Sequence, residues 1–198
     1  MKGLDYQPAG EYEEIDYYEN DCGVVFFHDM FKPYTEKELS LISKADVIYA
    51  VPPTVIGMNL FAKRAGVNRS GSWIELLVAI RTLARTLNKP MWVLSSGKDA
   101  RILMPDRLRP LKLYGCNSTV AVWNDDGQYE TIEQLTEGLS EKYNAVYDFC
   151  CGYGSSIRHF NYMIGSDINK KCLGYIKRAI LEGINEQDNN TRHNAKQP

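Results

Sequence analysis

One stretch of the chain, residues 145–167 (AVYDFCCGYGSSIRHFNYMIGSD), constrains the fold more than any other. An apolar run ends at Asp148, and Gly152 and Gly154 follow where a backbone can turn sharply and approach a ligand. A second apolar run ends in Asp167, an acid that can accept hydrogen bonds from ribose hydroxyls. The pattern predicts a strand, a ligand-binding glycine turn and a second strand. The alternative is an ordinary strand–turn–helix unit whose glycines only relieve crowding.

The rest of the chain alternates predicted strands with predicted helices. Short β-branched and aromatic runs predict strands at 22–27, 46–51, 91–94, 116–123, 145–148 and 162–165. Helices are predicted at 35–43, 72–88 and 131–142, each opened by Thr or Ser with Glu or Gln three residues later, and from Asn169 to about Gly183. This alternation predicts an α/β fold with a doubly wound, mainly parallel sheet, whose ligand lies at the carboxyl ends of the strands.

Some segments are predicted to lie outside this pattern. Residues 1–21 are acidic and rich in tyrosine, and we expect an N-terminal arm, either a solvated leader or a segment whose tyrosines pack over a neighbouring surface or subunit. Residues 22–184 then form a single ligand-binding domain, and 185–198 form a disordered polar tail. Residues 98–115 are basic and contain two prolines, so we expect irregular structure there.

Length, charge and cysteine content narrow the class of protein. A chain of 198 residues can bury about 70% of its unfolded surface as one domain. The net charge of -2 provides no overall basic field toward nucleic acid or membrane. The five cysteines form no CxxC pair, which predicts reduced thiols that pack as small core side chains. The sequence has no apolar run of membrane-spanning length and no secretion signal, so we expect a cytoplasmic protein. The three histidines lie far apart, which disfavours a metal site.

The acids and glycines of 145–167 resemble the first two motifs of the S-adenosylmethionine-dependent methyltransferases of the Rossmann-like class. The resemblance implies that Asp148, Gly152 and Gly154 pass the methionine part of the cofactor and that Asp167 holds its ribose. In that family an acid after the third strand binds the adenine amino group. Asp29, which follows the strand at 22–27, occupies the corresponding place.

The order of the motifs resembles a circularly permuted amino-methyltransferase, of the groups that modify DNA bases. The strands at 22–27 and 46–51 would be the third and fourth of the family, and those at 145–148 and 162–165 the first and second. The first and fourth strands are neighbours in the unpermuted family. The resemblance therefore predicts that 46–51 lies beside 145–148.

The predicted catalytic corner is Val51-Pro52-Pro53-Thr54, at the place where the family carries Asp, Asn or Ser, then Pro-Pro and an aromatic residue. Val51 has no side-chain acceptor for an amine, and Thr54 has no ring to stack on a base. By analogy with oxyanion-hole donors, one lost polar contact costs about 10²–10³ in rate. A cysteine nucleophile is disfavoured because no cysteine follows the two prolines.

Two functions therefore stay open. The first is a methyltransferase that acts on a nucleic acid base or another amine, with nucleic acid contacts through 52–71 and 98–113. The second is a cofactor-binding protein that does not methylate, either a degenerate subunit or an enzyme that degrades S-adenosylmethionine. The sequence also leaves open a homodimer or a partner subunit.

Overall fold

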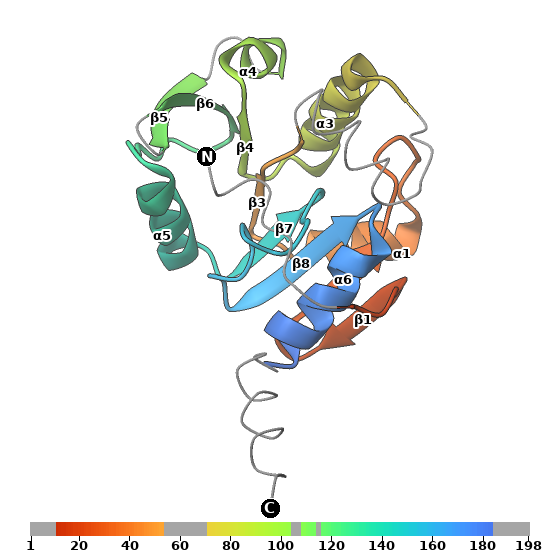
Figure 1. Cartoon of the computed structure of the whole chain (residues 1–198). Helices are drawn as coiled ribbons and strands as arrows, with labels where there is room; N and C mark the ends of the chain where they lie inside the picture. The colour runs from red at the N-terminus through yellow and green to blue at the C-terminus, as the bar shows by residue number, and fades with distance from the viewer. Residues whose placement is uncertain (1–10, 54–70, 104–107, 114–115, 184–198) are drawn as a thin grey trace, which may run out of the picture.

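The computed structural model describes residues 11–53, 71–103, 108–113 and 116–183 (Figure 1). Its strands are β1 Tyr17–Asn20, β2 Gly23–Phe27, β3 Val47–Ala50, β4 Met91–Ser95, β5 Leu108–Leu113, β6 Cys116–Trp123, β7 Ala145–Asp148 and β8 Tyr162–Asp167. Its helices are α1 Glu36–Ser43, α3 Trp73–Leu87, α4 Gly97–Leu103, α5 Ile132–Lys142 and α6 Lys170–Ile176, which continues into a π-helical turn, Lys177–Leu181. The predicted disordered tail and most of the predicted 52–71 loop lie outside the described residues.

The strands form one eight-stranded sheet in the order β1-β2-β8-β7-β3-β4-β6-β5. The five central strands from β2 to β4 are parallel, while β1 and β6 run antiparallel to their neighbours. The predicted mainly parallel α/β sheet is confirmed. The pairing of β3 with β7, with Val47 opposite Val146, also confirms the predicted neighbourhood of 46–51 and 145–148.

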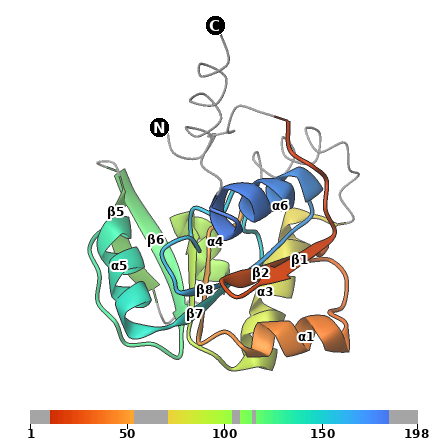
Figure 2. The same ribbon diagram turned by 90° about the horizontal axis from the view of Figure 1, so that it is seen from below.

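Helices cover both faces of the sheet, as the doubly wound prediction requires. The first face packs against α1, α3 and α4 through a cluster that includes Ile42 and Ile80. The second face packs against α5 and α6 through a cluster that includes Leu135 and Leu173. Figure 2 shows α6 and α1 on opposite sides of β1, β2 and β8. No helix in the described ranges is long and apolar enough to cross a membrane.

The sheet begins inside the segment predicted to be an N-terminal arm. Strand β1 pairs antiparallel with β2, with Tyr17 opposite Phe26. The side chains of β1 alternate only between exposed and half-buried positions, because the strand lies at the edge of the sheet. An edge strand of this kind carries no apolar period, so the sequence pattern does not reveal it.

The basic segment predicted to be irregular instead forms α4 and β5, so that prediction is wrong. Pro110 lies within β5, opposite Thr119 of β6. A proline cannot donate to a strand ladder, but β5 is the last strand of the sheet. Among the described residues its outer side forms an isolated bridge, between Lys112 and Thr131, and Pro110 takes no part in it. The edge position therefore tolerates a proline that would disrupt a central strand.

The cysteines only partly match the predicted core thiols. Cys151 and Cys172 are buried and Cys150 is half-buried, while Cys22 is exposed at the turn between β1 and β2. The core prediction is therefore wrong for Cys22, because the apolar run that follows it begins only at Gly23. In the described part of the chain, no group of three or more His, Cys, Asp or Glu side chains could hold a metal ion.

We predict that Ser72→Ala will lower the free energy of unfolding by about 1 kcal/mol, the usual effect of removing a helix N-cap. The Ser72 hydroxyl accepts from the Glu75 amide at 3.3 Å, and the Glu75 carboxylate accepts from the Ser72 amide at 2.5 Å. Urea unfolding measures the loss. The control is Ser40→Ala, at an exposed interior position of α1, where alanine is neutral or slightly stabilising. Equal losses in the two variants would contradict the capping role.

Candidate functional site

Three predicted cofactor acids lie at one edge of the sheet. Strands β2, β8 and β7 are adjacent and parallel, so their carboxyl ends meet at the same edge. Asp148 ends β7, Asp167 ends β8, and Asp29 follows β2 by two residues. The amide of His28, next to Asp29, donates to the Asp167 carbonyl oxygen at 3.2 Å. The structure therefore brings together acids that stand up to 138 residues apart in the sequence.

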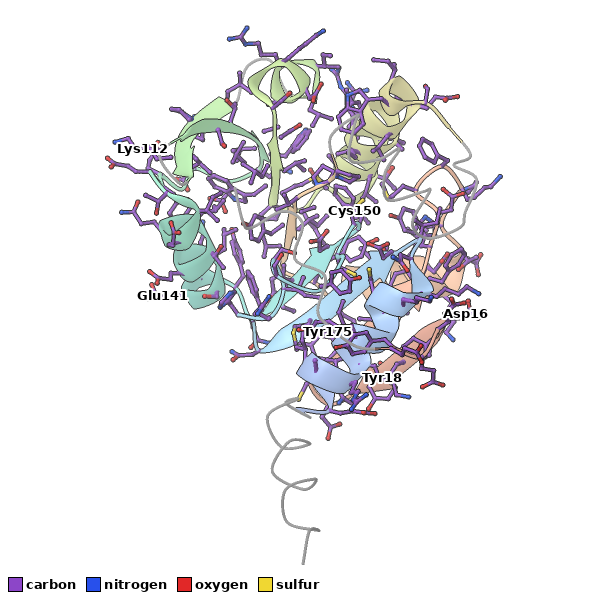
Figure 3. The ribbon with its side chains drawn as sticks, in the orientation of Figure 1. Asp16, Tyr18, Lys112, Glu141, Cys150 and Tyr175 are labelled. Atoms are coloured by element: carbon purple, nitrogen blue, oxygen red, sulfur yellow. The ribbon has the colours of Figure 1, made fainter. Side chains whose placement is uncertain are left out.

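The glycine turn after β7 is held by hydrogen bonds to these acids. The Cys150 amide donates to Asp148 Oδ1 at 2.8 Å, and the Ser156 hydroxyl donates to Asp148 Oδ2. Further along the turn, the Gly152 amide donates to Asp167 Oδ2 at 2.9 Å. Cys150 lies just past the end of β7 (Figure 3). Asp148 and Asp167 thus fix the path of the turn from both of its sides.

The Asp167 carboxylate is preorganised and keeps acceptor capacity. The Asn169 amide donates to Oδ1 at 2.8 Å, while Oδ2 accepts from Gly152. Each carboxylate oxygen carries two lone pairs, so further donors can still bind. The side chain is half-buried rather than enclosed. Asp167 can therefore accept hydrogen bonds from the hydroxyl groups of a ligand.

The two glycines of the turn have different surroundings. Gly152 has a φ of +49°, and a Cβ added there would meet nothing within 4 Å. Gly154 has a φ of +77°, and a Cβ there would lie 2.6 Å from Ile180 Cδ1 of the π-helical turn. Space beside Gly152 lets a ligand approach the backbone closely. Gly154 instead allows close packing of the turn on α6, the role that the alternative interpretation gave to these glycines.

Burial changes the ionisation of both acids. The Asp148 side chain is buried, and burial raises its pKa to about 7, with a smaller contribution from the negative charge of Asp167. The hydrogen bonds from Ser156 and Cys150 act in the opposite direction. Burial also raises the pKa of Asp167, opposed by the amides of Asn169, Gly152 and Ile168. A ligand with a positive charge would relieve this crowding of carboxylates.

Asp29 forms a short turn of its own. Its Oδ1 accepts from the Phe31 amide at 3.0 Å, and its carbonyl oxygen accepts from the Lys32 amide at 2.8 Å. The side chain is half-buried. The turn carries the chain away from the sheet and leaves the carboxylate at the edge shared with β8.

The predicted catalytic corner lies at the same edge, on the other side of β7. Val51 follows β3 directly, and Pro52 is buried while Val51 and Pro53 are half-buried. Val51 packs against the core cluster of the second face. Thr54 lies outside the described residues. The corner therefore offers apolar surface and backbone, without the side-chain acceptor found at the other strand ends.

The N-terminal segment packs on α6, which in turn contacts the glycine turn. The Tyr12 ring meets the Tyr175 ring edge-on at 5.1 Å between centroids, and Tyr175 meets Tyr153 of the turn in the same way at 5.3 Å. Figure 3 places Tyr175 on α6. Glu13 also forms an ion pair with Lys177 at 3.2 Å.

Sequence reasoning missed several side chains that shape the site. Ser156 bonds Asp148 from eight residues away, a spacing with no known signature. His28, Tyr147 and Ser166 each directly precede one of the three acids, and strand alternation places Tyr147 and Ser166 on the opposite face from Asp148 and Asp167. Their adjacency to the acids was a visible signal, but their contacts with one another were not.

Comparisons with known proteins give a distant likeness. No protein-family model matches the chain, and no curated protein matches it. Among solved structures, the crystal structure of the M1.HpyAVI–SAM complex is similar, with a TM-score of 0.45 and 11% identity over 77% of this chain and 97% of that one. Likeness at this level assigns no cofactor, substrate or site residue to this chain. The architecture rests on the strand order itself.

We predict that Asp148→Asn will change how stability depends on pH. Because the folded pKa of Asp148, about 7, lies above the ordinary value, its contribution is complete below about pH 4 and is lost as pH rises through about 7. Asparagine does not ionise. The variant should therefore gain about 2–3 kcal/mol relative to wild type between pH 5 and 8.5.

Urea unfolding at the two pH values measures this gain. The control is Asp126→Asn, whose side chain is fully exposed and which should follow wild type. Parallel curves for wild type and Asp148→Asn would show that the Asp148 carboxyl does not titrate in this range.

Proposed function

We propose that the chain binds S-adenosylmethionine at the carboxyl ends of β2, β8 and β7 and acts as a methyltransferase on a nucleic acid base or another amine. One observation carries the proposal. Asp29, Asp148 and Asp167 lie at adjacent strand ends, with a glycine turn whose Gly152 amide bonds to Asp167 at 2.9 Å. This is the arrangement that the resemblance to the methyltransferases requires.

The strand order supports a circular permutation of that fold. With β7, β8, β2, β3 and β4 taken as the family's first to fifth strands, the parallel core runs third, second, first, fourth, fifth. The first and fourth strands are then neighbours although nearly a hundred residues separate them in the chain. We infer that the cut lies between the helix after the second strand and the third strand.

The surroundings of the turn fit the cofactor. Open space beside Gly152 admits a ligand against the backbone, and Asp167 retains acceptor capacity for a ribose hydroxyl beside its bonds from backbone amides. Asp29 would accept from an adenine amino group, and Asp148 would shape the turn that passes the methionine part. When bound, S-adenosylmethionine supplies a methyl group on a positively charged sulfur.

Positioning is then the main task of the catalytic corner. Methyl transfer needs the nucleophile held in line at near-attack distance, which supplies most of the lowering of the barrier. Pro52 and Pro53 fix an extended backbone after β3, and an amine would have to donate to the carbonyl oxygens of this backbone. Val51 adds only apolar surface.

A second function is favoured by Val51. A corner without a side-chain acceptor suits a protein that binds the cofactor but does not methylate, either a degenerate subunit or an enzyme that degrades S-adenosylmethionine. The half-buried side chain packs against the core cluster of the second face and offers no polar atom to an amine. Only an activity measurement separates the two functions.

Nucleic acid remains the proposed macromolecular partner, reached through 52–71 and 98–113 in the cytoplasm. Lys98 and Arg101 of α4 and Lys112 of β5 are exposed and could contact phosphates. The overall charge of -2 gives no further attraction. A homodimer or a partner subunit would have to supply additional target recognition.

We predict that isothermal calorimetry will detect S-adenosylmethionine or its demethylated product binding to the wild-type chain, and that Asp167→Ala will weaken it by about 1–3 kcal/mol, the usual effect of unpaired buried hydroxyls. Asp126→Asn, far from the edge, should bind like wild type. No heat with either ligand, for a folded protein, would remove the proposal and leave a generic α/β domain.

We predict that wild type will transfer little methyl to DNA, RNA or small amines, and that Val51→Asp or Val51→Asn will raise transfer by about tenfold or more, because one preorganised polar group is worth about 10²–10³. A tritiated-methyl assay measures transfer, with cofactor breakdown followed in parallel. Val78→Asp, at an exposed position of α3, controls for the added charge.

The outcomes discriminate between the functions. If wild type methylates robustly and Val51→Asp methylates less, then the corner is active with valine at position 51. That result would contradict the interpretation that it lacks a required acceptor. Cofactor loss without a methylated product would identify a degrading enzyme.

A further inference from the structure

The residue before each cofactor acid is buried on the face of the sheet that packs against α1 and α3. His28 precedes Asp29, Tyr147 precedes Asp148, and Ser166 precedes Asp167. Strand alternation places Tyr147 and Ser166 on the opposite face from Asp148 and Asp167. His28 lies just past β2 and reaches the same face as Tyr147, where its ring stacks on Tyr34. All three preceding residues are buried, with exposed fractions of 5%, 0% and 0%. Buried polar groups are usually hydrogen-bonded. The hydroxyls of Tyr147 and Ser166 and Nδ1 of His28 have partners beneath the site, while Nε2 of His28 has none.

A chain of hydroxyl groups joins two of the three strand ends. Ser166 Oγ lies 2.8 Å from Tyr147 Oη, and Tyr147 Oη lies 3.0 Å from Tyr34 Oη. The Tyr34 hydroxyl donates to Met30 Sδ at 2.9 Å. With that direction set, Tyr147 donates to Tyr34 and Ser166 donates to Tyr147. Burial raises the pKa of both tyrosines, so both stay protonated and can donate.

The third strand end joins the same group through ring stacking. The His28 ring lies parallel to the Tyr34 ring, with centroids 3.8 Å apart and an interplanar angle of 11°. His28 Nδ1 lies 3.0 Å from Glu38 Oε1. Glu38 is itself fixed, because its carboxylate accepts from the Thr35 amide at 2.6 Å in the capping box of α1. The His28 ring is therefore fixed by stacking on Tyr34 and by the bond from Nδ1 to Glu38.

We propose that Tyr34, Tyr147 and His28 are positioning residues that set the spacing of Asp29, Asp148 and Asp167 from the far face of the sheet. The inference deepens the proposed cofactor site and rests on it. A shift of β8 relative to β7 would break the bond between Ser166 and Tyr147. A shift of the chain after β2 would separate the rings of His28 and Tyr34.

Strand pairing alone does not fix the position of Asp29, because the network begins where the strand ladder ends. The ladder between β2 and β8 ends at Phe27 and Asp167, and Asp29 lies beyond it. The His28 amide makes the last backbone bond to β8. Past that point, the stack of His28 on Tyr34, its bond to Glu38 and the bond of Tyr34 to Met30 tie the turn that carries Asp29 to the first face of the sheet. A core that needed only apolar filling would not require three hydroxyl groups here.

Conservative substitutions test this role, with affinity for S-adenosylmethionine measured by calorimetry on folded protein. Tyr147→Phe and Tyr34→Phe should each weaken binding about tenfold, the coupling expected of residues in one network. The matched control is Tyr49→Phe, a buried tyrosine of β3 whose hydroxyl contacts Thr136 at 3.4 Å on the other face. It should change binding by less than about twofold. Ser166→Ala serves as the second network variant where Tyr147→Phe does not fold.

A double-mutant cycle separates positioning from a general loss of stability. If Tyr147 acts through Asp167, then Tyr147→Phe should cost little affinity once Asp167→Ala is present, so the two losses should not add. A purely structural role predicts additive losses and an equal effect of Tyr49→Phe, and either result would overturn the inference. If every variant binds S-adenosylmethionine as tightly as wild type, the positioning role is overturned and the proposed function stands. A failure of wild type to bind would overturn the proposed function, and this inference with it.

Discussion

The whole structure depends on the insertion of β7 and β8 between two strands that follow each other in the chain. Strands β2 and β3 do not pair, because the β8–β7 pair lies between them. Asp46 closes this junction, since its carboxylate accepts from the amides of Asn144 and Ala145 at 3.1 and 2.9 Å. The first half of the chain therefore has no continuous sheet until the last third arrives. The same insertion creates the site, because Asp29 comes from one half and Asp148 and Asp167 from the other.

Carboxylates that converge at one edge of the sheet repel one another and raise the free energy of the folded protein. Hydrogen bonds from backbone amides to these carboxylates offset part of this cost. Backbone amides, among them those of Cys150, Gly152 and Asn169, and the hydroxyl of Ser156 donate to the two acids, of which Asp148 is buried and Asp167 half-buried. The raised pKa values of Asp148 and Asp167 show that burial still outweighs these bonds. An edge of this kind is suited to a ligand that brings both hydroxyl donors and positive charge.

The sequence predicts what is local and misses what depends on distant partners. The capping boxes at Thr35 and Ser72 are recovered because both partners lie within one helical turn. The strand order followed from a family resemblance, not from periodicity. The contact of Tyr34 with Tyr147 spans 113 residues, so no local pattern contains it. Pro110 misled the prediction of β5, because whether a strand is an edge strand is decided only when the sheet is complete.

The two sides of β7 are built for different tasks. On the side of β8 and β2, buried polar side chains from several elements bond to one another. Such a network costs free energy wherever a member lacks a partner, but it fixes the geometry of the groups that it joins. On the side of β3, the half-buried Val51 packs against the apolar core. If this edge of the sheet binds S-adenosylmethionine, side chains at the ends of β7 and β8 therefore hold the cofactor, while at the end of β3 only backbone groups are left to position the methyl acceptor. A methyl acceptor suited to this corner would carry a nucleophile that needs no side-chain acceptor from β3 to react.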